Sequence, residues 1–162
     1  MINLPKRSKE EVEEVLRLYS DMVYKIALSY MKNVQSAEDA YQNTFLRYME
    51  SDKVFGSEEY RKAWLIRVTF NECKKIYRQA FYRYTVPIDS VSESMLEFPE
   101  YHMDEVWDEI MKLPLKYRKV LHLFYYEELS VRQISEILRV KEGTVTSQLS
   151  RARQMLKRSL AI

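Results

Sequence analysis

Hydrophobic positions in the first half of the chain recur with a helical period. From about residue 8 to residue 31, apolar side chains return every three or four positions, as on one face of an amphipathic α-helix. A second such stretch runs to about Glu50, and Ser36 with Asp39 predicts a capping box at its start. A third helix is predicted from about Ser57. The first half of the chain is therefore predicted to contain three helices.

The third predicted helix has two contrasting faces. Its apolar seam follows the spacing i, i+4, i+7 and i+11 and consists of Ile66, Phe70, Cys73 and Tyr77. One residue further on, the same spacing gives a polar row that consists of Arg67, Asn71, Lys74 and Arg78. Three long basic side chains and one amide are more than a helix needs to stay in solution. We therefore expect the seam, Cys73 included, to pack in a core and the polar row to bind a ligand.

The last third of the chain has the pattern of a helix-turn-helix. Leu113-Pro114 predicts the start of a helix that reads LKYRKVLHLFYYEE. Ser130 and Gln133 predict a capping box for the short helix that follows. A four-residue turn over residues 139–142 leads to a second helix, whose inward positions are Val145, Leu149, Ala152 and Leu156.

The outward face of that second helix is chemically distinctive. It carries short hydroxyl side chains, one arginine and one amide: Thr144, Ser147, Ser150, Arg151 and Gln154. Short side chains let a helix approach the DNA major groove, and the amides of Gly143 and Thr144 can hold a phosphate. An arginine can form two hydrogen bonds with a guanine edge. We therefore expect a DNA-reading helix, with a solvated helix of a bundle as the alternative.

The net charge of +2 conceals an uneven distribution. Residues 84–111 contain no lysine or arginine and sum to −8, whereas residues 58–83 sum to +4 and residues 139–162 to +5. The acidic stretch carries Pro87 and Pro99, so it is predicted to contain an interdomain linker. The predicted fold class is all-α, with two small helical domains joined by an acidic linker, the second domain being the helix-turn-helix.

The composition argues against several classes of protein. The chain has 162 residues, of which 46% are hydrophobic, so it can bury a core. One cysteine and two distant histidines, His102 and His122, predict neither a disulfide framework nor a metal site, which suits a reducing cytosol. No stretch has the length of a membrane helix or the apolar segment of a signal peptide. Without a nucleophile and base, a phosphate loop or a metal cluster, we expect no enzyme, no cofactor and no small-molecule substrate.

Four segments, in this order, resemble the extracytoplasmic-function sigma factors, a family of bacterial RNA polymerase subunits. AEDAYQNTF (37–45) is similar to the family's core-binding helix, and AWLIRVTFNECKKIYR (63–78) to its promoter-melting helix. LPLKYRKVLHL and EGTVTSQLSRAR are similar to its C-terminal unit, which reads the minus-thirty-five element. The resemblance implies a region 2-like domain over residues 1–83, a linker over residues 84–104 and a region 4-like domain over residues 105–162.

The resemblance also implies three groups of site residues. Docking on core RNA polymerase would fall to Glu38, Asp39, Gln42 and Phe45. Recognition and melting of the minus-ten element would fall to Phe55, Trp64, Arg67, Asn71, Lys74, Lys75 and Arg78. Recognition of the minus-thirty-five element would fall to Gly143, Thr144, Ser147, Gln148, Ser150 and Arg151. Glu38 and Asp39 have an alternative explanation, because acids in the first turn of a helix favour its dipole without any partner.

The chemistry of the polar row suits an unpaired DNA strand. A protein can hold such a strand with basic side chains on the backbone and with surfaces that accept extruded bases. Arg67, Lys74 and Arg78 suit the phosphates, and Asn71 can both donate to and accept from a base edge. Phe55 resembles the family's pocket-forming loop in its position and its aromatic ring.

Three residues depart from the family pattern. Lys75 stands where the family commonly has an acid, Arg139 where the turn commonly has glycine, and Gln148 where the recognition helix often has arginine. Arg139 costs conformational ease if its position requires a positive φ. Gln148 removes one potential phosphate contact. These departures leave the expected fold unchanged, but they leave the promoter sequence unspecified.

The implied partners are core RNA polymerase, through its beta-prime clamp helices and beta flap, promoter DNA and a cognate anti-sigma factor. The implied location is the cytoplasm, with retention at the membrane by an anti-sigma factor as a variant. The acidic linker would pass near the active-site and RNA-exit path of the polymerase, although a solvated spacer has the same composition. Two alternatives are a helix-turn-helix regulator of duplex DNA whose N-terminal helices dimerise, and an interaction protein whose basic faces bind an acidic partner.

Overall fold

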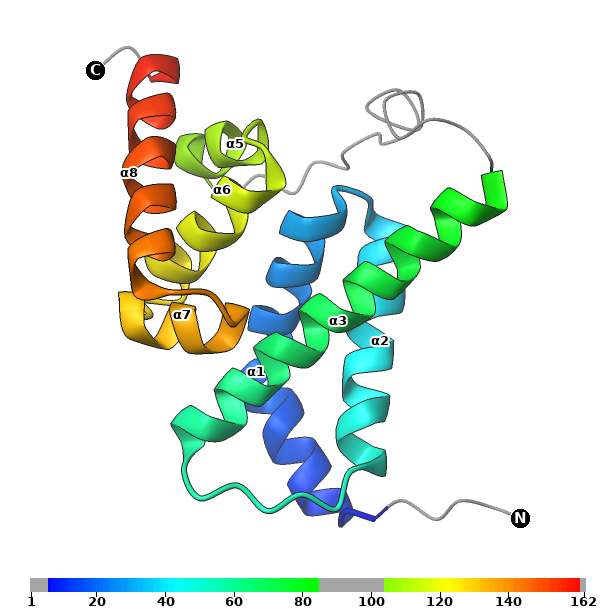
Figure 1. Ribbon diagram of the computed structural model, residues 1–162. Coiled ribbons are helices and arrows are strands. Elements are labelled where there is room, and N and C mark those ends of the chain that lie inside the picture. Colours follow the sequence, from blue (N-terminus) through cyan, green and yellow to red (C-terminus); the bar gives the residue numbers. More distant parts are fainter. Residues whose placement is uncertain (1–5, 85–103, 161–162) are drawn as a thin grey trace. The chain divides into compact units, whose positions relative to one another are not determined.

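The computed structural model describes residues 6–84 and 104–160, and every regular element in these two ranges is a helix (Figure 1). The predicted all-α class is therefore confirmed. The chain divides into two compact units, Met1–Glu97 and Phe98–Ile162, and each is described by itself. Apart from its two end residues, the predicted linker lies outside the described residues. Tyr84 ends a helix and Asp104 caps the next one.

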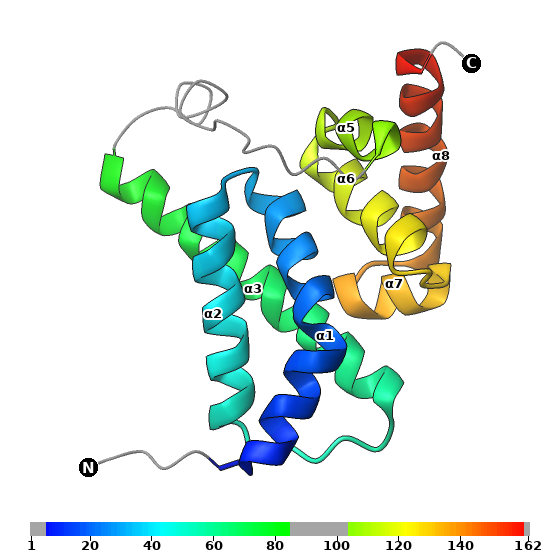
Figure 2. The same ribbon diagram turned by 180° about the vertical axis from the view of Figure 1, so that it is seen from behind.

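The first unit consists of α1 (Lys9–Met31), α2 (Val34–Glu50) and α3 (Glu58–Tyr84). α1 and α2 run side by side in opposite directions, and α3 crosses both (Figure 1). Seen from behind, α1 and α2 cover α3 (Figure 2). The core between them is built from one buried stripe on each helix, represented by Val15, Val23, Ile26, Ala40, Thr44, Tyr48, Leu65 and Ile66. Burial of each large apolar side chain stabilises the unit by about 1.5 to 3 kcal/mol.

The first residues of α2 differ from the prediction. The capping residue is Asn33, whose side-chain oxygen accepts a hydrogen bond from the Ser36 amide at 2.8 Å. Ser36 therefore lies inside the helix, and the predicted capping box is wrong. By contrast, α3 begins where predicted, and the hydroxyl of Ser57 accepts from the Tyr60 amide at 3.1 Å. Both caps satisfy amides that a helix start leaves without an intrahelical acceptor.

The apolar seam of α3 is shorter than predicted. Ile66, Phe70 and Cys73 are buried, but Tyr77 is 43% exposed. The C-terminal end of α3 extends past α1 and α2 (Figure 1), so the helical period continues where neither helix covers it. Tyr77 therefore keeps the spacing of the seam without its burial.

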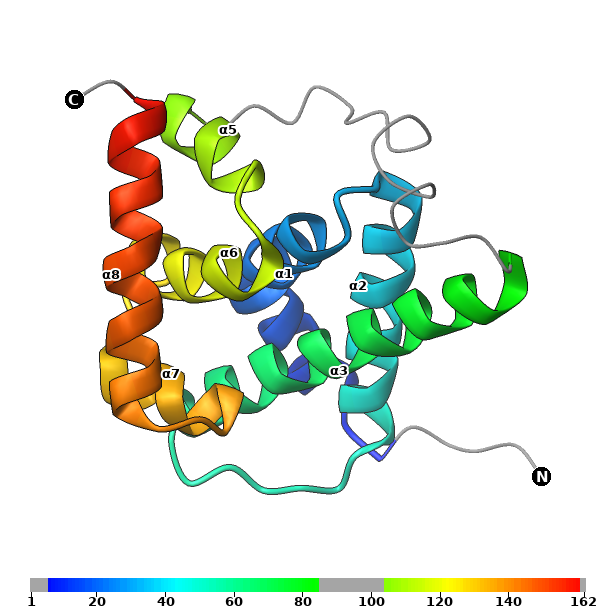
Figure 3. The same ribbon diagram turned by 45° about the horizontal axis from the view of Figure 1, so that its top comes forward.

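The second unit consists of α5 (Glu105–Met111), α6 (Leu115–Leu121), η1 (His122–Tyr126), α7 (Val131–Leu138) and α8 (Glu142–Ser159). α8 packs along α5, α6 and α7 (Figure 3). The core contains residues from all five elements, including Trp107, Val120, Leu123, Ile134, Val145 and Leu149. The predicted helix LKYRKVLHLFYYEE is α-helical only to Leu121 and continues as the wider π-helical turn η1.

α7, α8 and the turn between them form the predicted helix-turn-helix. The capping box of Ser130 and Gln133 is present, with both reciprocal hydrogen bonds. α7 ends at Leu138 and is capped by Arg139, which has a left-handed φ of 57°. The conformational cost expected at Arg139 is therefore present, because a side chain crowds the backbone at a left-handed φ. The turn is shorter than predicted, since Glu142 already belongs to α8.

Candidate functional site

The polar row of α3 lies on the outside of the first unit. Asn71, Lys74 and Arg78 are exposed and Arg67 is half-buried. Their spacing places them along one side of α3, and the buried residues Ile66, Phe70 and Cys73 hold the other side against α1 and α2. The surface therefore offers several cations and a single amide along a rigid helix.

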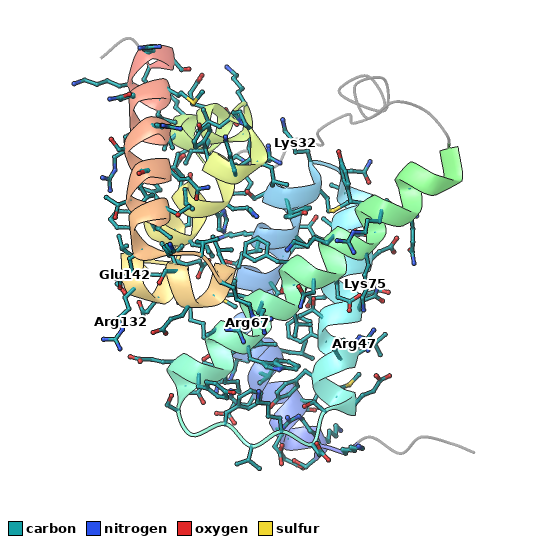
Figure 4. All side chains as sticks on the ribbon, viewed as in Figure 1. Lys32, Arg47, Arg67, Lys75, Arg132 and Glu142 are labelled. Carbon is teal, nitrogen blue, oxygen red and sulfur yellow. The ribbon has the colours of Figure 1, made fainter. Side chains whose placement is uncertain are left out.

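Lys75 is placed differently from the polar row. Its ammonium lies 3.3 Å from the Glu72 carboxylate, which also accepts from Nε of Arg47 at 3.1 Å. Figure 4 shows Arg47 and Lys75 on the neighbouring helices α2 and α3. Glu72 is 5% exposed. The charge of the exposed Lys75 side chain is therefore partly offset by the Glu72 carboxylate, and this face is less basic than the sequence alone indicates.

Phe55 belongs to an aromatic cluster, which we define as Tyr48, Phe55, Tyr60 and Trp64. The ring centroid of Phe55 is 5.5 Å from that of Trp64, 5.6 Å from that of Tyr60 and 6.3 Å from that of Tyr48. The sequence indicated no partner for Phe55, because these rings come from α2 and α3. The cluster fixes the loop of residues 51–57 against the first turns of α3.

The loop of residues 51–57 also borders a surface hollow of about 500 Å³. Its lining combines the loop, the last turns of α2 and the start of both α1 and α3, and includes Arg7, Glu11, Lys53, Phe55 and Arg61. Asn71 and Trp64 are not among its lining residues. Phe55 therefore borders the hollow on one side and contacts Trp64, three residues before Arg67, on the other.

A polar network holds the first turn of α3 on α1. The Tyr19 hydroxyl donates to the Glu58 carboxylate at 2.5 Å, and Arg61 donates to the same carboxylate from one turn further along α3. Burial, followed by the hydrogen bond to Glu58, raises the pKa of Tyr19 to about 12. The same hydrogen bond holds the pKa of Glu58 below its ordinary value. The network therefore stays in one charge state at neutral pH.

The proposed docking residues lie on one face of α2, with one exception. Glu38, Asp39 and Gln42 are exposed, whereas Phe45 is 6% exposed and packs edge-on against Tyr41. Phe45 therefore belongs to the core and offers no surface to a partner. Because α2 begins at Val34, both acids lie beyond its first turn, which removes the alternative explanation through the helix dipole.

The exposed face of α2 continues through a residue that the sequence reasoning missed. Leu46 is 47% exposed and lies one turn after Gln42. Its spacing of four residues from Gln42 could have identified it, because the two share a helix face. The face thus combines two carboxylates, one amide and one aliphatic side chain.

The predicted reader residues of α8 line a second hollow, of about 300 Å³. Its lining consists of Gly143, Thr144, Ser147, Gln148 and Arg151 from α8 with Lys116 and Tyr117 from α6. Ser150 is exposed but lies outside this lining. Lys116 and Tyr117 are new to the site, although both lie in the segment LPLKYRKVLHL, which resembles the family's C-terminal unit.

Arg151 is held by α6. Its guanidinium donates a hydrogen bond to the Tyr117 hydroxyl, and this bond, helped by the nearby Lys116 ammonium, lowers the pKa of Tyr117 below its ordinary value. The Tyr117 side chain is buried while Arg151 is exposed. A buried ring thus orients an exposed guanidinium, which favours two-point contacts with a planar acceptor.

One expected phosphate contact at the start of α8 is corrected. The Thr144 amide donates to the Lys141 carbonyl at 3.0 Å, so this amide already has an acceptor within the turn. Lys141 is the residue before α8 and makes no capping hydrogen bond through its side chain. The first turn of α8 therefore offers the Thr144 hydroxyl rather than its amide.

Two kinds of feature are absent from the described residues. Among residues 6–84 and 104–160, no helix is both long and apolar enough to cross a bilayer. The same part of the chain holds no group of three or more histidine, cysteine, aspartate or glutamate side chains placed to bind a metal ion.

Known families match both units. Residues 15–80 match the family described as sigma-70 region 2, and residues 103–156 match the family described as sigma-70, region 4. Similar proteins include the ECF RNA polymerase sigma factor SigM of Bacillus subtilis (strain 168), which is 32% identical over 153 residues, with 90% of this chain and 93% of SigM covered. SigW of the same organism, also an ECF RNA polymerase sigma factor, is 27% identical, with 96% of this chain and 91% of SigW covered.

Two solved structures share the fold. The sigma factor RpoE, determined in complex with the anti-sigma factor NepR from Bartonella quintana, has a TM-score of 0.75 at 21% identity, covering 94% of this chain and 98% of that one. CnrH, in complex with the cytosolic domain of CnrY, has a TM-score of 0.67 at 18% identity, covering 95% and 90%. The chain belongs to the ECF RNA polymerase sigma factors, a family of transcription initiation factors that bind DNA. A helix-turn-helix regulator that acts without being a sigma subunit is not favoured.

Proposed function

We propose that this sigma factor joins core RNA polymerase through the outer face of α2 and directs it to a two-part promoter. The docking face consists of Glu38, Asp39, Gln42 and Leu46, all exposed. Its two carboxylates suit a basic partner helix, and Leu46 adds apolar area at the centre of such a contact. The beta-prime clamp helices are the proposed partner. Phe45 supports this face from inside the unit.

α3 is the proposed minus-ten reader. Arg67, Lys74 and Arg78 hold the backbone of an unpaired strand, and Asn71 bonds the edge of an extruded base. Trp64 and Phe55 continue this surface towards the loop and provide rings on which bases stack. Lys75 contributes less to DNA binding than its neighbours, because Glu72 already binds its ammonium.

α8 is the proposed minus-thirty-five reader. Arg151, oriented by Tyr117, bonds a base edge, while Thr144, Ser147, Gln148 and Ser150 contact the groove and its phosphates. Gly143, with no side chain, lets the start of α8 approach the backbone. Lys116 on α6 adds a phosphate contact at the edge of the same hollow. The second unit, residues 105–162, is also the proposed partner of the beta flap, and residues 84–104 are the proposed linker.

The protein acts in the cytoplasm as an initiation factor without catalytic activity of its own. A cognate anti-sigma factor binds it and keeps it inactive. Where that anti-sigma factor is membrane-bound, the inactive complex is held at the membrane. The structure of the sigma factor RpoE in complex with the anti-sigma factor NepR supports the proposed anti-sigma factor, because RpoE shares the fold of this chain.

The observation that carries the proposal is the family membership of a chain whose two units each expose a DNA-suited helix face. Run-off transcription with purified core polymerase on genomic fragments of the source organism tests it. We expect the chain to co-purify with core and to produce transcripts from discrete start sites. A chain that neither binds core nor yields promoter-specific transcripts would contradict the proposal, and binding to duplex DNA alone would support the regulator instead.

A further inference from the structure

A nearly buried arginine outside the proposed interfaces lies beneath the loop of residues 51–57. The side chain of Arg7 is 9% exposed. Its Nε donates to the Tyr48 carbonyl at 2.8 Å, and one Nη donates to the Lys53 carbonyl at 2.7 Å. The other Nη lies 3.5 Å from the Glu11 carboxylate. The fixed fork of a guanidinium suits such a set of acceptors, because it donates in several directions from one plane.

The first of these contacts secures the end of α2. Tyr48 lies in the last turn of α2, where carbonyls lack the donors of a helix interior and a cation is favoured; the Tyr48 carbonyl also accepts from the Ser51 amide at 3.2 Å. The Lys6 amide donates to the neighbouring Met49 carbonyl at 3.3 Å. The segment before α1 is therefore attached to the C-terminus of α2 by two consecutive residues.

The second contact secures the loop itself. Lys53 is next to Val54, which is 89% exposed, so the loop projects into solvent with little apolar packing at this point. The Arg7 guanidinium carbon also lies 4.1 Å from the ring centroid of Tyr48 and 5.6 Å from that of Phe55. Cation–π contacts of this kind strengthen when the cation is desolvated, as it is here. One side chain thus joins a helix end, the loop backbone and the aromatic cluster.

The aromatic cluster connects the loop that Arg7 holds with the proposed DNA surface on α3. Phe55 contacts Trp64, and Trp64, Arg67 and Asn71 follow one another at helical spacing on α3. The edge of the loop is therefore the border of the strand-binding surface. We propose that Arg7 is a positioning residue for minus-ten recognition: it preorganises the loop of residues 51–57 against α3 so that the surface for the unpaired strand is complete before DNA binds. This inference rests on the proposed function of α3.

Promoter opening by the full chain with core polymerase tests the inference. Permanganate reactivity of thymines in the minus-ten region is compared for wild type, Arg7→Ala, Arg7→Lys and the control Arg17→Ala, an exposed arginine on α1. We expect promoter opening to fall on the order of tenfold in Arg7→Ala. Part of the free energy of DNA binding must then be used to order the loop of residues 51–57. Arg7→Lys keeps the charge at the helix end but not the fork, so its opening should be intermediate. Arg17→Ala should resemble wild type.

A spectroscopic measurement reports on the loop without DNA. Trp64 contacts Phe55, whereas the second tryptophan, Trp107, is fully buried in the other unit. Acrylamide should therefore quench the tryptophan fluorescence of Arg7→Ala more strongly than that of wild type. The difference should disappear when both proteins carry Trp64→Phe.

The possible results separate the explanations. Wild-type opening and quenching in Arg7→Ala would overturn the inference, and so would a parallel loss of core binding and helical content, which would make Arg7 a general stability residue. A wild-type chain that yields no promoter-specific transcripts would contradict the proposed function instead. In that case the quenching experiment still decides whether Arg7 orders the loop.

Discussion

Arg47 on α2 donates to the carboxylate of Glu72 on α3 over 3.1 Å and so connects the helix proposed to bind polymerase with the helix proposed to open DNA. The Glu72 side chain is 6% exposed, whereas that of Arg47 is 53% exposed. Removing a carboxylate from water is costly unless cations and hydrogen bonds compensate it. Arg47 and Lys75 provide this compensation, one from each helix.

Truncation of Arg47 should destabilise the first unit. In Arg47→Ala the buried carboxylate keeps only Lys75 of these two partners, so we expect the free energy of unfolding to fall by about 1 to 2 kcal/mol, a range that allows for the partial exposure of Arg47. Urea denaturation followed by Trp64 fluorescence measures the effect. Lys74→Ala, an exposed neighbour of Lys75, is the control and should stay within about 0.5 kcal/mol of wild type. Equal losses in the two variants would show that the ion pair is not stabilising.

Replacement of Asn71 should separate polymerase binding from DNA opening. Because Asn71 is exposed, Asn71→Ala should leave stability and core binding unchanged. If the amide bonds a base edge, the free energy of strand opening should become less favourable by about 1 to 3 kcal/mol. Permanganate footprinting measures opening and co-purification measures core binding. Gln79→Ala, an exposed amide on the same helix, is the matched control, and equal loss of both properties in Asn71→Ala would assign Asn71 to folding.

Arg151 should discriminate among bases, and Tyr117 should sharpen that discrimination. Arg151→Ala should weaken binding to the cognate minus-thirty-five duplex by about 1 to 3 kcal/mol relative to a scrambled one. Tyr117→Phe removes the hydrogen bond that orients Arg151, so it should reduce the same preference by a smaller amount. Fluorescence anisotropy on the two duplexes checks both variants, with Arg158→Ala as the control. A loss of equal size on both duplexes would make Arg151 a phosphate contact.

The left-handed backbone at Arg139 should be a removable source of strain. Its φ of 57° suits glycine, so Arg139→Gly should raise the free energy of unfolding of the second unit by about 1 kcal/mol. The greater backbone freedom of glycine in the unfolded chain reduces this gain. Arg139→Ala retains a side chain at this φ and should bring no such gain. Thermal unfolding monitored by circular dichroism compares the two. A higher midpoint for alanine than for glycine would show that strain at this position is negligible.

The buried thiol of Cys73 should give the first unit a measurable pH dependence. Burial, with the nearby Glu72 charge, raises the pKa of Cys73 from 9.0 to about 12. Between these values the folded state keeps a proton that the unfolded state has released, so stability falls as the pH rises from about 9 through 12. At pH 10 wild type should have lost about 1 kcal/mol more, relative to pH 8, than Cys73→Ala. Urea titrations at both values measure this difference, and parallel losses would contradict it.

The sequence predicted those helices whose burial follows one period. α1, α2 and α3 were foreseen within a few residues, because amphipathic spacing reflects packing on neighbouring helices. The choice of Asn33 over Ser36 as a cap could not be foreseen from residue type, since both can cap a helix. Lys32, the residue before Asn33, adopts a left-handed conformation that ends α1 and turns the chain towards α2. Tyr77 and Phe45 show that spacing places a residue on a face without saying what covers that face.

The candidate site was foreseen mainly where its residues are local in sequence. The outward residues of α8 and the polar row of α3 each lie within one helix, so a repeat every three or four positions identifies them. Tyr117, Glu72 and Arg7 escaped notice, because their partners come from other helices or from a distant loop. Lys75 likewise acquires its meaning only through Glu72. Such contacts depend on tertiary packing, which one-dimensional spacing does not encode.

The exposure of Thr144, Ser147 and Ser150 has a consequence for how promoter preference can be transplanted between sigma factors. These side chains can be exchanged with those of a relative at little cost to the fold, so we expect specificity at the upstream element to move with a handful of residues. Specificity at the downstream element will not move so easily. An α3 helix taken from a relative must be transferred together with the residue at position 47 on α2, the loop of residues 51–57 and the residue at position 7. Chimeras that separate these parts should fail to open promoters.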